Sequence, residues 1–291
     1  MPTATDSLAV PSFPELKREL PGYSPCAWRF GAMAVASRAG ALLSEGLRIG
    51  HRHGFDSGPF MAHVYENSPR GRTPVGRAID RRLLARRTCQ AFREIRALAR
   101  HAIDEAIAAD ASGAPVIADL AGGPAPYLFD ALAAHSGAVA IVGDIDRVAL
   151  RQARAAAARV GVEDRVRFVN ASAFDRGALA ALEPSPTIVV ELGLYGIYHD
   201  DAMIERHFHD LAETLAPRQI VFNVQTQNPE IEHIARVWRD HRGERCVWRL
   251  RALDQILAWA AAAGYEPASI RADSNGIYRV GRLRRAGGAS T

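Results

Sequence analysis

The sequence is poor in several features that mark particular classes of protein. Its three cysteines (Cys26, Cys89 and Cys246) are far apart and show no paired metal-ligand spacing. We therefore expect reduced thiols in a cytoplasmic protein, with no disulfide scaffold and no metal centre. No apolar run reaches the roughly 18–20 residues of a membrane span. The N-terminus lacks the basic stretch and apolar core of a signal peptide, so no membrane partner is expected.

Lysine is nearly absent. Lys17 is the only lysine among 36 basic residues, and the formal net charge is +4. The arginines are interleaved with acidic residues, and only residues 70–100 are locally arginine-rich. We interpret that stretch as solvated helix faces and attribute the arginine excess to a GC-rich genome. A basic composition permits a nucleic-acid partner without indicating one, and we expect none.

Hydrophobic patterning divides the chain of 291 residues into four segments. Residues 1–25 carry five prolines and are expected to form a flexible arm. Residues 26–112 are mainly helical, with continuous helical periodicity over 77–109, and are expected to form a lid. Residues 113–285 alternate between strands and helices and form the expected core, and 286–291 are expected to be a disordered tail.

Within the core, short apolar runs alternate with Ala- and Leu-rich helical stretches. This alternation predicts an α/β, Rossmann-like fold with a mostly parallel seven-stranded sheet and helices on both faces. At the C-terminal end, PASIRAD and GIYRVGRL flank Ser274-Asn275-Gly276, which predicts an antiparallel hairpin. The expected strands cover 115–120, 138–143, 166–169, 187–192 and 219–224, and the expected helices cover 126–135, 146–160, 176–182, 200–215, 229–242 and 252–263.

The loop after the first expected strand indicates a cofactor site. It reads DLAGGPAPY from Asp119, and its small residues let a ligand approach the backbone near a helix N-terminus. Asp144 ends the second strand, 21 residues after Gly123, which is the spacing of an acid that binds a ribose diol. Either element alone is typical of an ordinary turn or helix cap, whereas together they favour an adenosine-type cofactor. The G-x-G-x-x-G and P-loop lysine motifs are missing, which argues against a dinucleotide and a nucleoside triphosphate.

These segments resemble class I methyltransferases that use S-adenosylmethionine (SAM). More narrowly, the chain is similar over about residues 26–285 to a bacterial methyltransferase family, some of whose members adjoin an α/β-hydrolase. It departs from the family pattern at Pro124 and Pro126, at Ser172 in place of an acid, and in VQTQNP at 224–229. The segments that carry the resemblance are GLRIGHRHGFDSGPFMAHVYENSPRGRTPVGRAIDR, DLAGGPAPYLFDAL, ASAFDRGALAAL, GLYGIYHDD, NPEIEHIARVWRDHRGERCVWRLR and DSNGIYRVGRL.

The resemblance implies where SAM would bind. Asp119 corresponds to the leading acid of the loop, which lies around the methionine moiety, and Asp144 to the acid that binds the ribose. Ser172 stands where an Asp often takes the adenine amino group, so Phe174 and backbone groups are expected to replace it. The full set of expected cofactor residues is Asp119, Ala121, Gly123, Pro124, Asp144, Ile145, Asn170, Ser172, Ala173, Phe174, Glu191 and Gly193.

The sequence is compatible with several reactions. Methyl transfer to a small molecule is the leading hypothesis, with Tyr195, Tyr198, Asn223 and Gln225 as catalytic candidates at the strand ends. Both tyrosines fit a core position equally well, and His199 is either a base or a helix cap. The main alternative is an azetidine-2-carboxylate synthase, in which the SAM amine attacks its own γ-carbon and releases 5′-methylthioadenosine. A nucleic-acid methyltransferase is less favoured because residues 191–199 lack the N/D-P-P-Y/F motif. A SAM-fold protein without catalytic activity is a further alternative.

The lid supplies another group of candidates. A small-molecule substrate and a homodimer are the expected partners. Residues 54–58 (GFDSG) resemble an ordered functional loop, although packing of Phe55 onto the core is the simpler interpretation. The lid residues that could reach the site are Trp28, Phe30, Asp56, Phe60, Tyr65 and Arg77.

Overall fold

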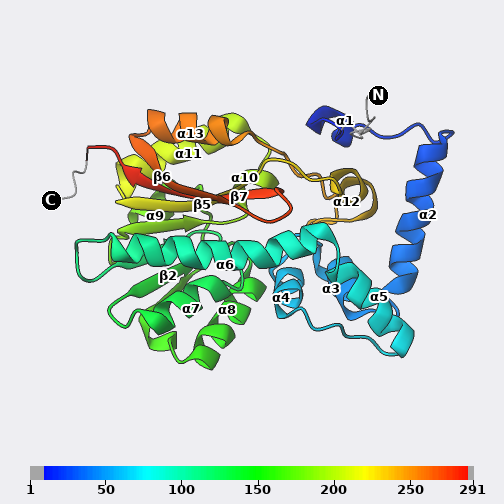
Figure 1. The fold of residues 1–291 in the computed structure, drawn as a ribbon, viewed down its shortest axis with the longest axis horizontal. Helices are drawn as coiled ribbons and strands as arrows, with labels where there is room; N and C mark the ends of the chain where they lie inside the picture. Colours follow the sequence, from blue (N-terminus) through cyan, green and yellow to red (C-terminus); the bar gives the residue numbers. More distant parts are fainter. Residues whose placement is uncertain (1–9, 288–291) are drawn as a thin grey trace, which may run out of the picture.

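Short apolar strands build the centre of the molecule in the computed structural model, which describes residues 10–287. The seven strands form one sheet in the order β3-β2-β1-β4-β5-β7-β6 (Figure 1). β1 to β5 are parallel, and β7 pairs antiparallel with both β5 and β6. The strands are β1 (Val116–Asp119), β2 (Val139–Gly143), β3 (Val166–Val169), β4 (Ile188–Glu191), β5 (Gln219–Gln225), β6 (Tyr265–Ala272) and β7 (Tyr278–Arg285). The α/β sheet with its antiparallel C-terminal hairpin is therefore confirmed.

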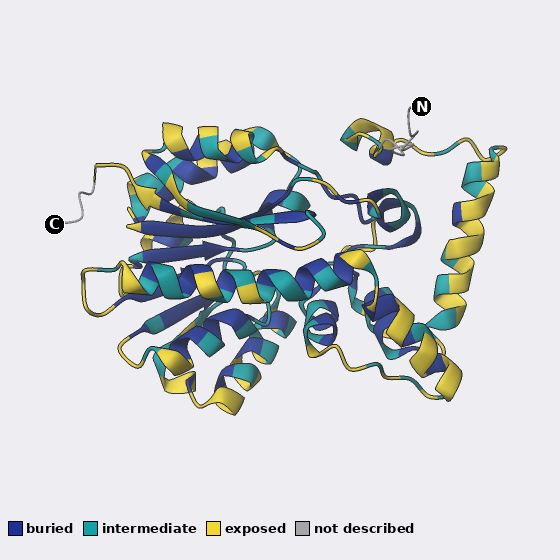
Figure 2. Cartoon of the chain, in the orientation of Figure 1, coloured by how far each residue is buried: buried dark blue, intermediate teal, exposed yellow. Residues whose placement is uncertain are grey.

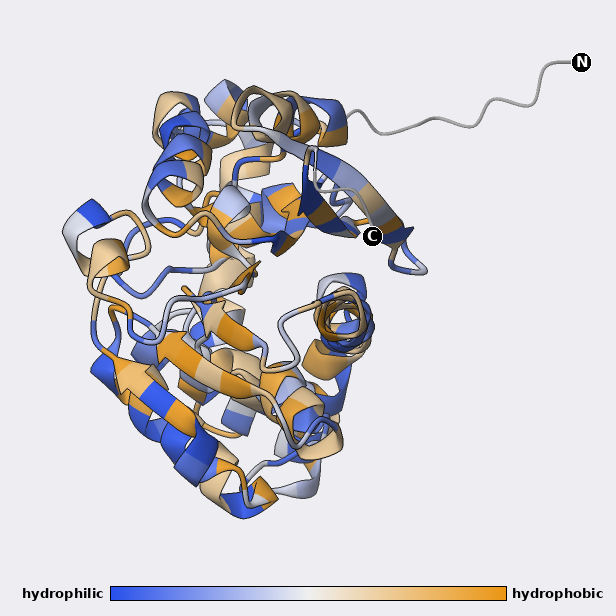
Figure 3. Cartoon of the chain, turned by 90° about the vertical axis from the view of Figure 1, so that its left-hand side faces the viewer, coloured by the Kyte–Doolittle hydropathy of each residue, from blue (hydrophilic) through white to orange (hydrophobic). Residues whose placement is uncertain are grey.

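Alternation along each strand creates two separate apolar layers. Val190 packs into one core cluster and its neighbour Val189 into the other, because successive side chains point to opposite faces of a sheet. Hydrophobic residues line the strands between the two helical layers (Figure 3). One face is covered by α6 (Arg87–Ala108), α7 (Pro126–Ala134) and α8 (Arg147–Val160), and the other by α9 (Arg176–Ala180), α10 (Leu194–Ile197), α11 (Asp201–Thr214) and α13 (Leu253–Ala262).

A helical cap lies at one end of the sheet and combines two distant parts of the sequence (Figure 1). Phe55 from the first part stacks on Trp238 from the second, with ring centroids 4.4 Å apart. The backbone N–H of Phe55 also donates to the carbonyl of Arg239 at 2.9 Å. The cap consists of α1 (Phe13–Lys17), α2 (Pro25–Gly40), α3 (Glu45–His53), α4 (Gly58–Glu66), α5 (Pro74–Leu84) and α12 (Ile231–Val237).

Local sequence explains where the cap helices begin. Ser24, Ser44, Ser57 and Thr73 each precede a helix and accept a hydrogen bond from a backbone N–H of its first turn. Such N-caps satisfy donors that have no partner inside the helix. The helices differ in burial: α2 is exposed along most of its length, whereas β1, β4 and β5 are buried throughout (Figure 2).

A buried carboxylate holds three cap helices together. Asp80 of α5 accepts hydrogen bonds at Oδ1 from the Ser44 hydroxyl and the Gly46 N–H, both at 2.6 Å. At Oδ2 it accepts from His63 Nε2 at 2.9 Å and from the Arg70 N–H at 2.8 Å. The Arg70 guanidinium, which can only donate, lies 3.1 Å from His63 Nδ1. This arrangement fits a hydrogen bond donated from His63 Nε2 to Asp80 and one accepted at Nδ1 from Arg70.

Several expected boundaries need correction. The helical periodicity over 77–109 is divided between α5 and α6, since the chain turns at Ala85 and Arg86. The expected lid, 26–112, includes α6, but this helix packs along the sheet against β5 and β7 and belongs to the core layer. The helix expected over 229–242 ends at Val237, because a tight turn closed by Asp240 follows it.

The chain ends also differ from expectation. Within the expected flexible arm, α1 is helical, and Leu16 is buried. The Arg236 guanidinium donates to the carbonyls of Glu15 and Arg18, which fixes α1 beside α12. Residues 1–9 and most of the expected tail, 288–291, lie outside the described residues. Within residues 10–287, no helix is both long and apolar enough to cross a membrane.

Candidate functional site

A cavity of about 590 Å³ lies where the cap meets the ends of β1, β2, β4 and β5. One wall is formed by the loops that follow these strands, and the opposite wall by α4, α6 and the segment after α12. Ligands of open α/β sheets bind at this edge, outside the carboxyl ends of the strands. The predicted site residues that line the cavity are Ala121, Gly123, Pro124, Asp144, Ile145, Gly193, Tyr198, Asn223 and Gln225.

The loop after β1 leaves room for a ligand and is fixed from behind. Gly123 has a φ of +51° and open space where a Cβ would stand. Its N–H donates to Asp144 Oδ2 at 2.9 Å, and the Asp146 N–H donates to Oδ1 at 2.8 Å. At Gly122, a Cβ would lie only 2.9 Å from Val142 Cγ1, so the close packing of loop on strand requires glycine. Burial is the main cause of the raised pKa of Asp144.

Asp119 lies beneath this loop and does not line the cavity. It is fully buried, and Oδ2 accepts a hydrogen bond from the Tyr127 hydroxyl at 2.8 Å. Burial raises the pKa of Asp119 to about 7, against the opposing effect of the Tyr127 hydrogen bond. Oδ1 has no hydrogen-bond partner among the described residues. The structure therefore places Asp119 behind the cavity wall, and its expected contact with the cofactor stays a prediction.

The expected adenine-binding segment after β3 also lies outside the cavity wall. Asn170 donates to the carbonyls of Asp144 and Ile145, so it supports the loop after β2. The Ser172 hydroxyl accepts from the Phe174 N–H, and Ser172 and Ala173 line a separate, much smaller cavity.

Phe174 reaches the site indirectly. Its ring centroid lies 4.5 Å from that of Tyr198, which does line the cavity. These residues thus shape the site from behind rather than from its surface.

Tyr195 is a buried structural residue in this fold. Its hydroxyl donates to Glu191 Oε2 at 2.5 Å, and the other carboxylate oxygen of Glu191 pairs with His207. All three side chains are shielded from solvent, and the Tyr195 ring packs near Phe208 and Phe222. The structure corrects the prediction that Tyr195 and Glu191 face the site, because α10 directs Tyr195 into the core, where it meets Glu191 at the end of β4.

The polar ends of β5 do face the cavity. Asn223 accepts from the Gly193 N–H at 2.8 Å and so fixes the loop after β4. Gln225 is 2 % exposed, and its Nε2 has no partner among the described residues. A buried amide donor without a partner loses free energy unless a ligand satisfies it. Gln225 is therefore positioned to bind a ligand oxygen.

The cap contributes a hydrogen-bonded histidine–aspartate pair that the sequence did not reveal. His241 Nδ1 lies 2.9 Å from Asp56 Oδ2, and the His241 N–H donates to Asp56 Oδ1 at 2.7 Å. The hydrogen bond with Asp56 raises the pKa of His241. Nε2 makes no hydrogen bond within residues 10–287, so this histidine can accept a proton at the cavity wall. The two residues are 185 positions apart, and no spacing rule connects them.

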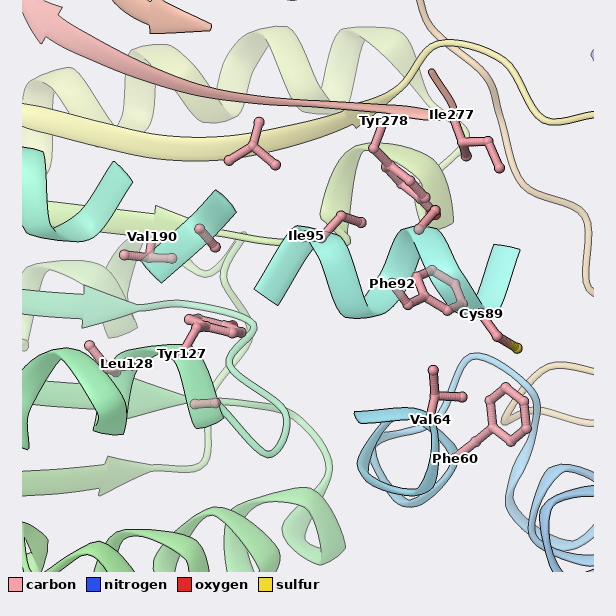
Figure 4. Packing of buried hydrophobic residues seen from close by; sticks show 14 of the residues in the cluster. Phe60, Val64, Cys89, Phe92, Ile95, Tyr127, Leu128, Val190, Ile277 and Tyr278 are labelled. Atoms are coloured by element: carbon pink, nitrogen blue, oxygen red, sulfur yellow. The ribbon is translucent and has the colours of Figure 1, made fainter. Parts of the chain in front are cut away.

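Aromatic side chains complete the wall opposite the loops. Phe92 of α6 lies between Val64 of α4 and Tyr278 (Figure 4). Its ring centroid is 5.9 Å from those of both Trp248 and Tyr278. Tyr65 also lines the cavity, and burial raises the pKa of both Tyr65 and Tyr278. This wall is apolar and carries neutral hydroxyl groups.

Only two of the lid candidates reach the cavity, namely Asp56 and Tyr65. Trp28 is exposed on α2, Phe30 and Phe60 are core residues, and Arg77 is exposed on α5.

His199 does not line the cavity either. Its Nε2 lies within hydrogen-bond distance of the Val247 carbonyl, and burial lowers its pKa. No local pattern indicated Trp248 or Tyr278 as site residues, since both belong to segments that only the fold brings to the site.

Comparison with known proteins gives a consistent result. Residues 5–285 match a protein-family model described as "Putative methyltransferase". The chain is 31% identical over 260 residues to the protein YnbC of Escherichia coli strain K12, which covers 87% of this chain and 44% of YnbC. The chain thus spans less than half the length of this relative.

Solved structures share the fold at low identity. A possible exported protein from Bordetella parapertussis has a TM-score of 0.61 at 16% identity, covering 91% of this chain and all of that one. Magnesium protoporphyrin IX methyltransferase from Synechocystis PCC 6803, solved with bound S-adenosylhomocysteine, has a TM-score of 0.56 at 14% identity. That match covers 81% of this chain and 98% of the other. At these identities the likeness concerns the fold alone.

Proposed function

Because the chain belongs to the family described as "Putative methyltransferase", we propose that it transfers a methyl group from SAM to a small-molecule acceptor. The cofactor is SAM. The observation that supports a small acceptor is the cavity itself, in which the loop after β1 and Asp144 face a wall of amides and aromatic rings. A homodimer and a cytoplasmic location stay predictions.

The residues of the strand-loop wall fit SAM. The open face of Gly123 allows close approach to the backbone, and Asp144 keeps lone pairs beyond its two backbone hydrogen bonds. Carboxylates at this position suit the two hydroxyls of a ribose. Ile145, Val148 and Tyr198 offer an apolar surface beside them for a flat base. Bound SAM supplies an electrophilic methyl group on a sulfonium.

The end of β5 and the opposite wall would together hold the acceptor and accept its proton. Gln225 Nε2 is a free buried donor that can orient an acceptor oxygen. His241, held by Asp56, can take the proton of an attacking hydroxyl or amine on Nε2. The rings of Phe92, Trp248 and Tyr278 exclude water, which favours methyl transfer over hydrolysis.

The test is mass analysis of SAM incubated with the purified protein, first alone and then with pools of phenols, amines and carboxylic acids. We expect SAM to stay intact alone and to give S-adenosylhomocysteine and a methylated product with one pool. His241→Gln is expected to lower kcat with little change in SAM affinity.

Three results would contradict the proposal. Methylthioadenosine and azetidine-2-carboxylate from SAM alone would establish the intramolecular cyclisation. Transfer only to nucleic acid would move the acceptor to another class. Absence of SAM binding in calorimetry would indicate a protein without this catalytic function.

A further inference from the structure

A second cavity, of about 510 Å³, adjoins the first on the outer side of the cap. The C-terminal turn of α3, Arg38 of α2 and the segment 239–243 after α12 form its walls. Arg52, His53 and His241 line both cavities, so the two spaces meet at these side chains.

The second cavity is strongly basic. Its lining includes four arginines and three histidines, with Asp240 as its single carboxylate. That carboxylate already accepts hydrogen bonds from the Arg242 guanidinium and from the N–H groups of Arg242 and Glu244. The other three arginines are Arg38, Arg52 and Arg239. They have no ion pair and no side-chain hydrogen bond with any residue in 10–287.

The positive groups are held on a fixed frame. The carbonyl of Arg239 accepts from the Phe55 N–H at 2.9 Å, and the Gly243 N–H donates to the Asp240 carbonyl at 3.0 Å. Gly54 has a φ of +96°, and a Cβ there would lie 2.3 Å from the backbone nitrogen of His241. The turn between α3 and α4 and the segment after α12 are therefore packed closely against each other.

Helix electrostatics explains only part of this charge. Basic residues in the last turn of α3 are favourable beside its C-terminal carbonyls, which accounts for Arg52 and the adjacent histidines. Arg38 comes from another helix, and Arg239 lies beyond the end of α12. Arginines from three segments thus surround one recess, and an anion bound among them would interact favourably with all three.

We propose that this basic cavity binds an anionic group of the methyl acceptor, a phosphate or a carboxylate, whose reacting end enters the first cavity past His241. The guanidinium fork matches the oxygens of both groups, and such charge-assisted hydrogen bonds are strong. The acceptor is then an anionic small molecule. This inference rests on the proposed function, because it takes the first cavity as the site of methyl transfer.

The test uses inorganic pyrophosphate and citrate as probes of the two anion types, titrated into the full chain by calorimetry. The test variant is Arg38→Gln/Arg239→Gln, since neither residue lines the first cavity. The matched control is Arg82→Gln/Arg151→Gln, which removes equal charge at exposed helix positions. We expect the test variant to bind the preferred probe at least about tenfold more weakly and the control to bind it as the wild type does. The probe preferred by the wild type identifies the anion type.

SAM affinity separates the two proposals. Both variants are expected to bind SAM as the wild type does and to unfold at the wild-type urea concentration. If the double variant is unstable, Arg239→Gln alone is expected to weaken probe binding in the same direction.

The inference is overturned if neither probe binds the wild type, if the control loses equal affinity, or if the test variant loses SAM binding. It is also overturned if a short single-stranded RNA binds to the cluster more tightly than both probes. Methyl transfer to neutral acceptors alone, unaffected by either probe, would refute the anion site and leave the proposed function standing. Probe binding without any methyl transfer would refute the proposed function and leave the anion site standing.

Discussion

Replacement of Asp80 by asparagine tests whether the cap depends on one buried carboxylate. Asp80 is fully buried, and its two oxygens accept four hydrogen bonds, from Ser44, Gly46, His63 and Arg70. Asparagine has the same shape but offers one NH₂ group in place of an oxygen. Whichever way the amide turns, that group faces two donors.

The expected loss follows from these contacts. Two charge-assisted hydrogen bonds are lost, and each contributes about 1.5–3 kcal/mol. Asp80→Asn is therefore expected to lower the free energy of unfolding by about 3–6 kcal/mol, a large share of the roughly 5–15 kcal/mol that stabilises a typical domain. The helices α3, α4 and α5 would loosen first, because the lost bonds connect them.

Urea unfolding followed by circular dichroism measures this loss. Glu205→Gln is the matched control, since it makes the same carboxylate-to-amide change at an exposed position of α11. It is expected to change stability by less than about 0.5 kcal/mol. A loss below about 1 kcal/mol in Asp80→Asn would refute the reasoning, because even one such bond contributes more.

The pH dependence of stability provides a second check on Asp80. Burial acts to raise its pKa, but hydrogen bonds from His63, Ser44 and the N–H groups of Arg70 and Gly46 outweigh it and lower the pKa. The folded state therefore binds its proton less readily than the unfolded state. The contribution is fully present above the unfolded pKa of about 4 and is lost as the pH falls through the folded pKa. The difference between wild type and Asp80→Asn is thus expected to shrink at acid pH.

Three further predictions concern the site. Asp144→Ala is expected to weaken SAM binding about tenfold to a hundredfold in calorimetry, and an unchanged Kd would reject the ribose role. Tyr195→Phe removes the hydrogen bond to Glu191 and is expected to lower the free energy of unfolding by about 1.5–3 kcal/mol at wild-type kcat. A large loss of kcat with intact stability would return Tyr195 to catalysis. Because the hydrogen bond with Asp56 raises the pKa of His241 and a base acts deprotonated, activity is expected to rise with pH through that pKa. In Asp56→Asn this rise is expected to move to lower pH, and an unmoved pH–rate profile would exclude His241 as the base.

The fold could be predicted closely wherever local pattern and packing agree. The five parallel strands fall within a few residues of their expected positions, because each is a short, mainly apolar run, and all but the edge strand β3 are largely buried. The hairpin formed where Asn275-Gly276 predicted it, although Asp273 organises the turn by accepting from the N–H groups of Asn275 and Tyr278. Predictions failed where a helical pattern continued across a turn, as at Ala85, since periodicity does not record a change in direction.

The candidate site divides in the same way. Gly123 and Asp144 were predictable because they follow two consecutive strands, β1 and β2, which pair side by side in the sheet. For both Tyr195 and Tyr198, the sequence fitted a catalytic and a core position equally well. The short helix α10 directs Tyr195 into the core, whereas Tyr198 follows the end of the helix in extended backbone and lines the cavity.

The sequence by itself determined the order of strands and helices, the loop that fits SAM and the family to which the chain belongs. These depend on residues close together in the chain, where spacing alone fixes geometry. Only the tertiary structure decided that His241 meets Asp56 and that Arg38, Arg52 and Arg239 surround one recess. Those contacts arise when the segment after β5 packs against the N-terminal helices, so their residues share a site without sharing any local pattern. Among the many arginines of this lysine-poor chain, the unpaired guanidinium groups at this recess are therefore the ones that we expect to bind a ligand.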